Sequence, residues 1–441
     1  MSSKTSRREF IKRSAFSTIA IWASDRAWAQ GGKSPNDRVQ IACIGVGGKG
    51  DSDSANANKY GRIVAICDVD ENILNAHAEK YPEAQKFTDY RKMLDKLDKE
   101  IDAVTVSTPD HNHGPAATWA MAMRKNCYCQ KPLAHSVYEI RRMEQLAREY
   151  NLATQMGNQG TANNSMREAA YKVRAGMIGN VSEVHVWTNR PIWPQGIPRP
   201  ATKPVPSYLH WNLWIGPRPK RPYADGYAPF AWRGFWDFGC GAIGDMMCHT
   251  ANLPYMALDL INPDTIVAHC TGDDYPKESY PKSSKLTWHF PANGVRGEVT
   301  LHWYDGGALP DSSLLPGETF ASSGSLMIGD KGKVYSPGDY GDQWKLIDGV
   351  DVGDVKYPIS PGPWEDGHWM EFISAIKGEG TTMSNFPNYA GPLAETCILG
   401  NTAVWVNGKT IEWDYEHMRA KNAPEVDLLL RPRFLNGFKL S

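Results

Sequence analysis

The sequence predicts an α/β protein of two domains, the first with a doubly wound parallel sheet and the second with an antiparallel or mixed sheet. Two observations predict this fold class. Up to about Gly160, short apolar strand-like runs alternate with helical stretches; after it, strand-like runs follow one another without regular intervening helices. Repeated alternation of strand and helix indicates a parallel sheet with helices on both faces, whereas alternating polarity is typical of antiparallel strands.

The apolar runs of the first domain define its elements in order. We expect strands at Val39–Ile44, Arg62–Cys67, Asp102–Ser107 and Cys127–Gln130 and near Ala153–Met156, and helices at Glu71–Lys80, Pro115–Arg124 and Val137–Tyr150. In the second domain we expect strands at Glu183–Thr188, Lys285–Phe290, Gly297–Trp303 and Ser325–Ile328.

A long proline-rich segment separates the first of these strands from the rest. Ten prolines lie between Pro191 and Pro229, and they argue against regular structure there. Such a long loop is usually functional or an arm toward a partner subunit. Thirteen of the sixteen tryptophans fall from Trp187 onward. Their rings could stack on sugars, but we expect most of them in the sheet core and a subunit interface.

Residues 1–29 carry the pattern of a twin-arginine export signal. Twin arginines stand in the run SRREFIK, a mildly apolar run follows from Ala15 to Ala23, and residues 27–29 fit an A-x-A cleavage site. Nine residues cannot span a hydrocarbon layer of about 30 Å. The sequence therefore predicts transport by the Tat machinery to the bacterial periplasm, a mature chain from about Gln30, and no stable membrane anchor.

Charge and cysteine content exclude several classes of protein. The formal net charge is −1 and no basic block follows the signal, so nothing favours nucleic acid or a membrane surface as partner. Eight cysteines do not make a disulfide framework in a chain of 441 residues. His111 and His113 with Cys127 and Cys129 could suggest zinc, but C-x-C spacing is too narrow for the usual tetrahedral site. We expect no metal, and we expect His113 near a cofactor or substrate instead.

A glycine-rich turn directly after the first strand predicts a dinucleotide site. Gly45, Gly47 and Gly50 have the G-x-G-x-x-G spacing, with Val46 inside the turn. Glycine permits the tight turn and close approach of the pyrophosphate, which then sits on a helix N-terminus. Asp68, 23 residues after Gly45, ends the next strand, where a carboxylate accepts from ribose hydroxyls. The acidic residues 70 and 71 beside it would repel a 2′-phosphate, which favours NAD over NADP.

Two further groups of residues point to chemistry. Lys131 follows the end of a predicted parallel strand, where open α/β sheets bind ligands, although a lone lysine there could also be solvated. Asp245 and His249 are four residues apart, so on a helix they share one face. Such a pair could tune an imidazole as general base. Alternatively, Asp245 is a helix N-cap and His249 a packed histidine.

These motifs in this order resemble the Gfo/Idh/MocA oxidoreductase family over nearly the whole mature chain. Gln130-Lys131-Pro132 is similar to the family's E-K-P motif, and the glycine-rich run ending in Asp245 and His249 to its D-x-x-x-H motif. The loop STPDHNH at 107–113 resembles the family's cofactor-approaching loop, which brings Thr108, Pro109 and His113 to the dinucleotide. One departure is Gln130, because the family usually has glutamate there.

The resemblance implies an NAD-binding Rossmann domain at 36–158 and a C-terminal α/β domain at 159–441, with a large open, mostly antiparallel sheet that often serves oligomerisation. It implies that Lys131 and His249 are catalytic, supported by Asp245, and that Gln130 and Lys131 adjoin the cofactor. The expected function is oxidation of a secondary alcohol of a sugar, cyclitol or glycoside, with a tightly bound NAD and in a homo-oligomer. The alternatives are an NAD-dependent glycosidase acting by transient oxidation and elimination, and a non-catalytic sugar or cofactor sensor.

Overall fold

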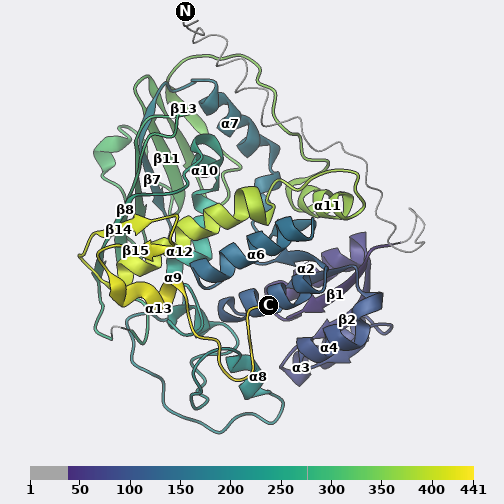
Figure 1. The fold of residues 1–441 in the computed structure, drawn as a ribbon. Coiled ribbons are helices and arrows are strands. Elements are labelled where there is room, and N and C mark those ends of the chain that lie inside the picture. Colours follow the sequence, from purple (N-terminus) through teal and green to yellow (C-terminus); the bar gives the residue numbers. More distant parts are fainter. Residues whose placement is uncertain (1–37, 276) are drawn as a thin grey trace, which may run out of the picture. The chain divides into compact units, whose positions relative to one another are not determined.

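Two β-sheets organise the part of the chain that the computed structural model describes, residues 38–275 and 277–441 (Figure 1). The first sheet has six parallel strands and the second has nine strands, of which all neighbouring pairs but one are antiparallel. The predicted fold class is therefore confirmed. The predicted export signal, residues 1–29, lies outside the described residues.

The parallel sheet has the strand order β3-β2-β1-β4-β5-β6. Its central strands are buried along almost their whole length, which is why they are apolar without alternation. The strands are β1 (Gln40–Ile44), β2 (Arg62–Cys67), β3 (Gln85–Phe87), β4 (Ala103–Val106), β5 (Asn126–Cys129) and β6 (Thr154–Met156). The helices of this half are α2 (Lys49–Tyr60), α3 (Glu71–Lys80), α4 (Tyr90–Leu97), α5 (His113–Ala122) and α6 (Val137–Glu149).

The large sheet has the order β13-β12-β11-β7-β10-β9-β8-β14-β15, with β7 and β10 as its parallel pair. Along β10 buried and half-buried residues alternate, as expected for a sheet with one covered face. The strands are β7 (Val181–Trp187), β8 (Thr265–Thr271), β9 (Ser283–Phe290), β10 (Val299–Tyr304), β11 (Gly324–Gly329), β12 (Gly332–Pro337), β13 (Lys345–Asp348), β14 (Ile411–Asp414) and β15 (Arg419–Ala420).

Helices cover one face of this sheet and connect it to the other half. Helix α12 contacts β8 on one side and α6 on the other, so one apolar core runs through both halves (Figure 1). The helices are α7 (Asn164–Arg174), α8 (Trp211–Ile215), α9 (Gly241–Thr250), α10 (Asn252–Leu258), α11 (Trp364–Ile376), α12 (Gly391–Trp405) and α13 (Asp427–Leu430). Single turns of 3-10 or π helix complete the chain at 98–100, 110–112, 159–162, 231–234, 312–314, 386–390 and 424–426.

The elements expected from the sequence are present within two residues of their observed ends. Elements that the sequence analysis did not name include the helices α4, α7, α10 and α11 and the strands β3, β8 and β12. Helix α12 is missed because it is buried nearly all round and therefore lacks a helical polarity pattern. Within the proline-rich segment, the prediction of no regular structure is wrong in one place. The helix α8 forms in the proline-free window 207–216.

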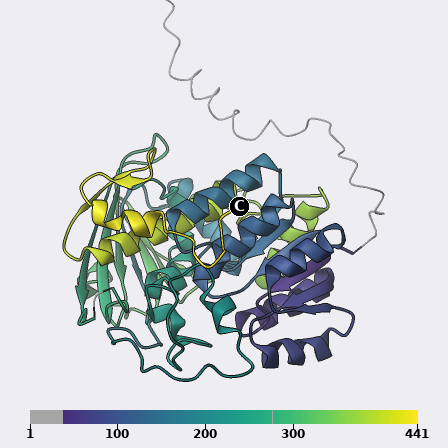
Figure 2. The same cartoon turned by 60° about the horizontal axis from the view of Figure 1, so that its bottom comes forward.

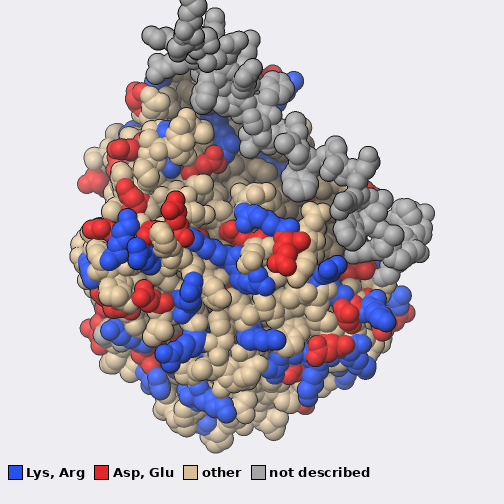
Figure 3. Space-filling model, in the orientation of Figure 1, with Lys and Arg blue, Asp and Glu red and all other residues tan. Residues whose placement is uncertain are grey.

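The surface and interior agree with the composition. On the face shown in Figure 3, Lys and Arg side chains are interspersed with Asp and Glu. Among the described helices, none is both long and apolar enough to cross a membrane. All eight cysteines are free thiols. Most tryptophans fill the core, including Trp187, Trp288 and Trp303 of the large sheet, as expected.

Candidate active site

A cavity of about 530 Å³ opens at the carboxyl ends of the parallel strands. This is the edge where open α/β sheets bind ligands. Its walls include the loops after β1, β2, β4 and β5, the helix α9, and the proline-rich segment. Of the predicted site residues, these line it: Gly45, Gly47, Asp68, Thr108, Pro109, His113, Gln130, Lys131, Asp245 and His249. Val46 and Gly50 are not part of this lining.

The glycine turn has the backbone geometry that its spacing predicts. Gly45 has φ +77°, and a Cβ on it would lie 2.7 Å from the carbonyl oxygen of Ser107. A Cβ on Gly50 would lie 2.2 Å from the carbonyl oxygen of Gly45, so a larger residue at position 50 would clash with the turn. The N-terminus of α2 has no side-chain cap, and Gly48 and Lys49 line the cavity there. Turn and helix N-terminus together fit a dinucleotide pyrophosphate.

Asp68 lies at the end of β2, at one end of the cavity. Its Oδ2 accepts from the backbone N–H of Val46 at 3.0 Å, and its Oδ1 accepts from that of Asp70 at 3.0 Å. Burial raises the pKa of the Asp68 carboxyl above its ordinary value, although these N–H groups stabilise the carboxylate. The bond to Val46 ties the carboxylate to the glycine turn.

The histidines of the loop after β4 bridge backbone carbonyls. Nδ1 of His113 lies 2.8 Å from the carbonyl oxygen of Pro132, and its Nε2 lies 2.7 Å from that of Thr108. Burial lowers the pKa of His113 to about 4. The ring lines the cavity, and both nitrogens face backbone carbonyl oxygens; the neutral ring has one N–H and donates to one of them. No group of three or more His, Cys, Asp or Glu residues able to hold a metal ion occurs in residues 38–275 and 277–441.

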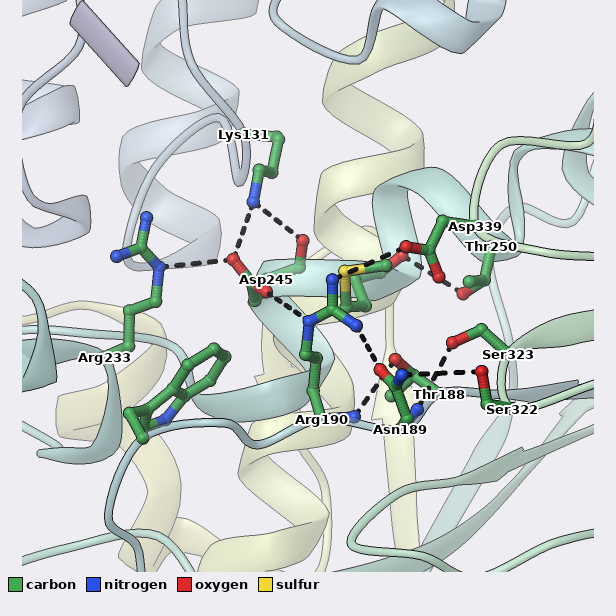
Figure 4. Close-up of polar contacts among 12 residues, drawn as sticks. Lys131, Thr188, Asn189, Arg190, Arg233, Asp245, Thr250, Ser322, Ser323 and Asp339 are labelled. Carbon is green, nitrogen blue, oxygen red and sulfur yellow. Dashed lines mark hydrogen bonds and ion pairs between the residues drawn. The ribbon is translucent and has the colours of Figure 1, made fainter. Parts of the chain in front are cut away.

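Lys131 and two arginines converge on Asp245 (Figure 4). Nζ of Lys131 donates to Oδ1 of Asp245 at 2.7 Å and to its carbonyl oxygen at 2.9 Å. Arg233 donates from Nε to the same Oδ1 at 3.2 Å, and Nε of Arg190 lies 4.0 Å from Oδ2. Burial alone would raise the pKa of Asp245, but the charges of Lys131 and Arg233 outweigh it and lower the pKa to about 2.

Asp245 is therefore an ionised counter-charge rather than a helix cap, since Cys240 occupies the N-cap of α9. Lys131 has three N–H donors, of which Asp245 takes two. One donor is left for a ligand in the cavity. Arg233 also lies over the ring of Trp232, 4.2 Å from its centroid, which fixes the guanidinium against an aromatic wall.

His249 follows Asp245 by one helical turn on α9 and is 5 % exposed. Burial, and then the charge of Lys131, lower the pKa of His249 to about 3, so the imidazole is neutral at pH 7. Its Nδ1 has no hydrogen-bond partner among the described residues. The ring packs edge-on against Tyr340, with 5.1 Å between centroids. A neutral imidazole in this position can accept a proton from a bound hydroxyl.

The amide of Gln130 is matched to a buried carboxylate that sequence reasoning missed. Nε2 of Gln130 donates to Oδ2 of Asp53 at 2.8 Å, and Ser107 donates to the same oxygen at 2.7 Å. Lys49 contacts Oδ1 of Asp53 at 3.3 Å. A glutamate in place of Gln130 would set two carboxylates against each other. The buried carboxylate of Asp53 on α2 thus explains why position 130 has an amide instead of a second carboxylate.

Sequence reasoning also missed Arg190, Arg233 and Tyr340. Arg233 offers a signal, because it is a lone cation within the aromatic run from Phe230 to Trp236. Arg190 and Tyr340 carry no such signal in the sequence, because only the folded chain brings Arg190 close to Asp245 and Tyr340 against His249.

Both halves of the chain match models of one family. Residues 39–158 match its NAD-binding Rossmann-fold domain, and residues 172–434 match its C-terminal alpha/beta domain. This chain belongs to the Gfo/Idh/MocA oxidoreductase family.

Curated relatives match a limited part of the chain. The inositol 2-dehydrogenase of Paracoccus denitrificans is 32 % identical over 111 residues, 24 % of this chain and 32 % of that protein. That of Salmonella paratyphi B is 29 % identical over 90 residues, 20 % of this chain and 26 % of that protein. Glycosyl hydrolase family 109 protein 2 of Shewanella sp. MR-4 is 30 % identical over 115 residues, 24 % of this chain and 25 % of that protein. The matches thus span about a third or less of each relative.

Solved structures share the fold over a longer range. The WlbA dehydrogenase of Bordetella pertussis, in complex with NADH and UDP-GlcNAcA, superposes with a TM-score of 0.61 at 15 % identity, covering 86 % of this chain and 99 % of that one. An inositol dehydrogenase homologue of Azotobacter vinelandii, complexed with NADH and myo-inositol, gives 0.59 at 12 % identity, over 86 % and 98 % of the two chains.

Proposed function

We propose that this protein is an NAD-dependent oxidoreductase that oxidises a secondary alcohol of a sugar, cyclitol or glycoside. The observation that carries the proposal is the arrangement of Lys131, Asp245 and a neutral His249 in one cavity with the glycine turn of β1. The family match and the dehydrogenases among relatives and fold neighbours support the same reaction class.

The residues present fit a dinucleotide. The glycine turn and the N-terminus of α2 would hold its pyrophosphate, and Asp68 its adenosine ribose. Thr108, Pro109 and Gln130 would adjoin its other half. When bound, NAD supplies the hydride acceptor.

Side chains of the protein accept the hydroxyl proton and stabilise the negative charge that develops on the substrate oxygen. His249 accepts the hydroxyl proton, because its imidazole lines the cavity and is neutral at pH 7. The remaining N–H of Lys131 stabilises negative charge developing on the substrate oxygen. Asp245 orients Lys131 through two hydrogen bonds and balances its charge. Together these groups hold the alcohol in one orientation, which itself lowers the barrier.

The twin-arginine pattern supports export to the periplasm with the cofactor already in place. Free nicotinamide cofactor is scarce outside the cytoplasm, so an exported enzyme would retain NAD and recycle it with a second sugar or within one catalytic cycle. The large open sheet supports a homo-oligomer.

A second candidate is an NAD-dependent glycosidase, in which transient oxidation acidifies a neighbouring C–H and a glycosidic bond is eliminated. The Shewanella relatives described as glycosyl hydrolases favour keeping it. Both routes start with the same alcohol oxidation. Net hydrolysis of a glycoside without net NADH would indicate elimination, and a keto glycoside would indicate simple oxidation.

The deciding experiment denatures untagged protein purified from the periplasm and assays the supernatant for NAD(H) and NADP(H). About one NAD(H) per chain is expected. An empty protein that also fails to bind added NAD would overturn the assignment. A non-catalytic sensor is tested separately with His249→Ala: an enzyme loses turnover of its sugar substrate, whereas a sensor has no turnover to lose.

A further inference from the structure

The proline-rich segment, here called the arm (residues 191–229), folds back onto the parallel sheet of its own chain. Leu209 of the arm forms an antiparallel bridge with Asp70, in the loop after β2. The backbone N–H of Glu71 donates to the carbonyl oxygen of Tyr208 at 2.9 Å, and that of His210 donates to Val69 at 2.9 Å. These bonds attach the arm directly beside Asp68.

The same segment is attached on the opposite side of the glycine turn. The carbonyl oxygen of Trp214 accepts from Nδ2 of Asn112 at 3.1 Å and lies 2.8 Å from Nε2 of His111. The rings of His111 and Trp214 are also in contact, with centroids 5.3 Å apart. His111 and Asn112 belong to the loop after β4. The chain from Tyr208 to Trp214 therefore joins the loop after β2 to the loop after β4.

The strand order decides what lies beneath this segment. Since β1 lies between β2 and β4, a segment joined to the loops after both must pass the glycine turn that follows β1. Leu209, Leu213 and Trp214 line the same cavity as Gly45 and Asp68. Figure 2 shows the arm as the teal loop that runs along the lower edge toward the purple first strands.

The C-terminal segment holds the arm from outside. Nδ2 of Asn436 donates to the carbonyl oxygens of Gly216 at 2.9 Å and of Arg218 at 2.8 Å. Two residues later, Phe438 packs under the guanidinium of Arg91 on α4, 4.2 Å from the ring centroid. Asn436 itself does not line the cavity. The side chain of Asn436 can therefore be changed without removing a group that lines the cavity, whereas Phe438 is such a group.

The arm has its own apolar cluster, so it is a packed element. Leu209, Trp211 and Trp214 are each less than 10 % exposed. They pack with the later aromatic residues of the arm and with Phe235 and Phe238, which precede α9. Packing of this kind gives the arm a defined attached state that local opening would have to disrupt.

We propose that residues 208–214 form the outer wall of the cofactor site at the Asp68 end, and that the bound dinucleotide dissociates only when this segment detaches. This inference rests on the proposed function, since it assumes that the cavity binds NAD. It gives the arm a specific role in cofactor retention, which an exported enzyme requires. Dissociation limited by opening of a lid is a common kinetic pattern.

The test measures NADH dissociation from full-length mature protein by stopped-flow fluorescence, with excess NAD as trap. Asn436→Gly removes two hydrogen bonds to the arm and suits the left-handed backbone at position 436, where φ is +57°. His210→Ala removes the side-chain contact to Glu71 at 2.8 Å. We expect the change at Asn436 to accelerate dissociation about tenfold, equivalent to about 1.4 kcal/mol. His210→Ala removes one exposed contact and should accelerate dissociation less. Val205→Ala is the matched control, because Val205 is an arm residue with 45 % exposure outside the cavity.

Thermal melting of each variant separates loss of the arm contact from loss of the fold, since Asn436→Gly and His210→Ala should each still melt in one cooperative transition. Faster release in both contact variants, with Val205→Ala unchanged, supports the proposal. Equal release rates in all proteins would refute the arm's role while leaving NAD binding intact. A wild-type protein that binds no NADH would refute the proposed function as well.

Discussion

Replacing Asp245 with asparagine removes the negative charge on which Lys131, Arg233 and Arg190 converge while keeping the side-chain shape. Lowering of the Asp245 pKa from 3.8 to about 2 corresponds to about 2 kcal/mol of favourable interaction with the ionised form, at 1.36 kcal/mol per pH unit. We therefore expect Asp245→Asn to lower the free energy of unfolding by about 2 kcal/mol at pH 7. Turnover should fall as well, because Lys131 loses its charged anchor.

The direction of the Asp245 pKa shift determines how the stability difference between wild type and variant changes with pH. Because the folded-state pKa of Asp245 is depressed, its contribution is present above the unfolded value of 3.8 and is lost as pH falls toward 2. The urea-unfolding free energies of wild type and variant should therefore differ at pH 7, and the difference should shrink as pH falls from about 4 toward 2. Asp225→Asn is the matched control, because Asp225 pairs with Lys203 at the exposed surface and the loss of such a pair should change stability little. A difference that is absent at pH 7, or that persists unchanged at about pH 2, would refute the electrostatic argument.

Three further predictions concern neighbouring groups. Lys131→Met should lower kcat about 100-fold to 1,000-fold while NAD binding is retained, as for loss of one oxyanion donor; an unchanged kcat would remove Lys131 from the reaction. Because the pKa of His249 is about 3, protonation of His249 should cause no fall in kcat/KM between pH 8 and pH 5. A fall in kcat/KM below about pH 6.5 that disappears in His249→Ala would contradict the neutral state of this imidazole. Gln130→Glu places a second carboxylate against that of Asp53 and should lower the free energy of unfolding by about 1–3 kcal/mol at pH 7, and by less at lower pH. The same change at Gln145, which is exposed, should leave stability unchanged. Equal melting temperatures of the two variants would contradict the pairing of Gln130 with Asp53.

Local patterns were enough to predict the scaffold of the site. The glycine turn after an apolar strand, and Asp68 at the end of the next strand, depend on neighbours in sequence. So does the i, i+4 placement of Asp245 and His249 on α9. Each prediction rests on backbone periodicity or turn chemistry that acts over a few residues. Such interactions are visible without knowing where the rest of the chain lies.

Long-range packing decided the charges of the site. Gln130 and Asp53 are 77 residues apart, and Lys131 and Asp245 are 114 apart. Whether His249 is neutral and Asp245 ionised depends on burial and on cations delivered by other segments, such as Arg233 and Arg190. A pKa is set by the three-dimensional surroundings of a group, so residue type alone cannot give it.

The arm shows the same division most clearly. The prolines of the arm predict an irregular segment. The sequence leaves open whether this segment contributes to a functional site or contacts a partner subunit. Its place against the loops after β2 and β4 follows from backbone hydrogen bonds and apolar contacts to distant residues. The sequence by itself determined the fold class, the glycine turn and the candidate catalytic side chains. The tertiary structure decided their charges, their partners and the wall that closes the cavity, because these depend on contacts between segments far apart in the chain.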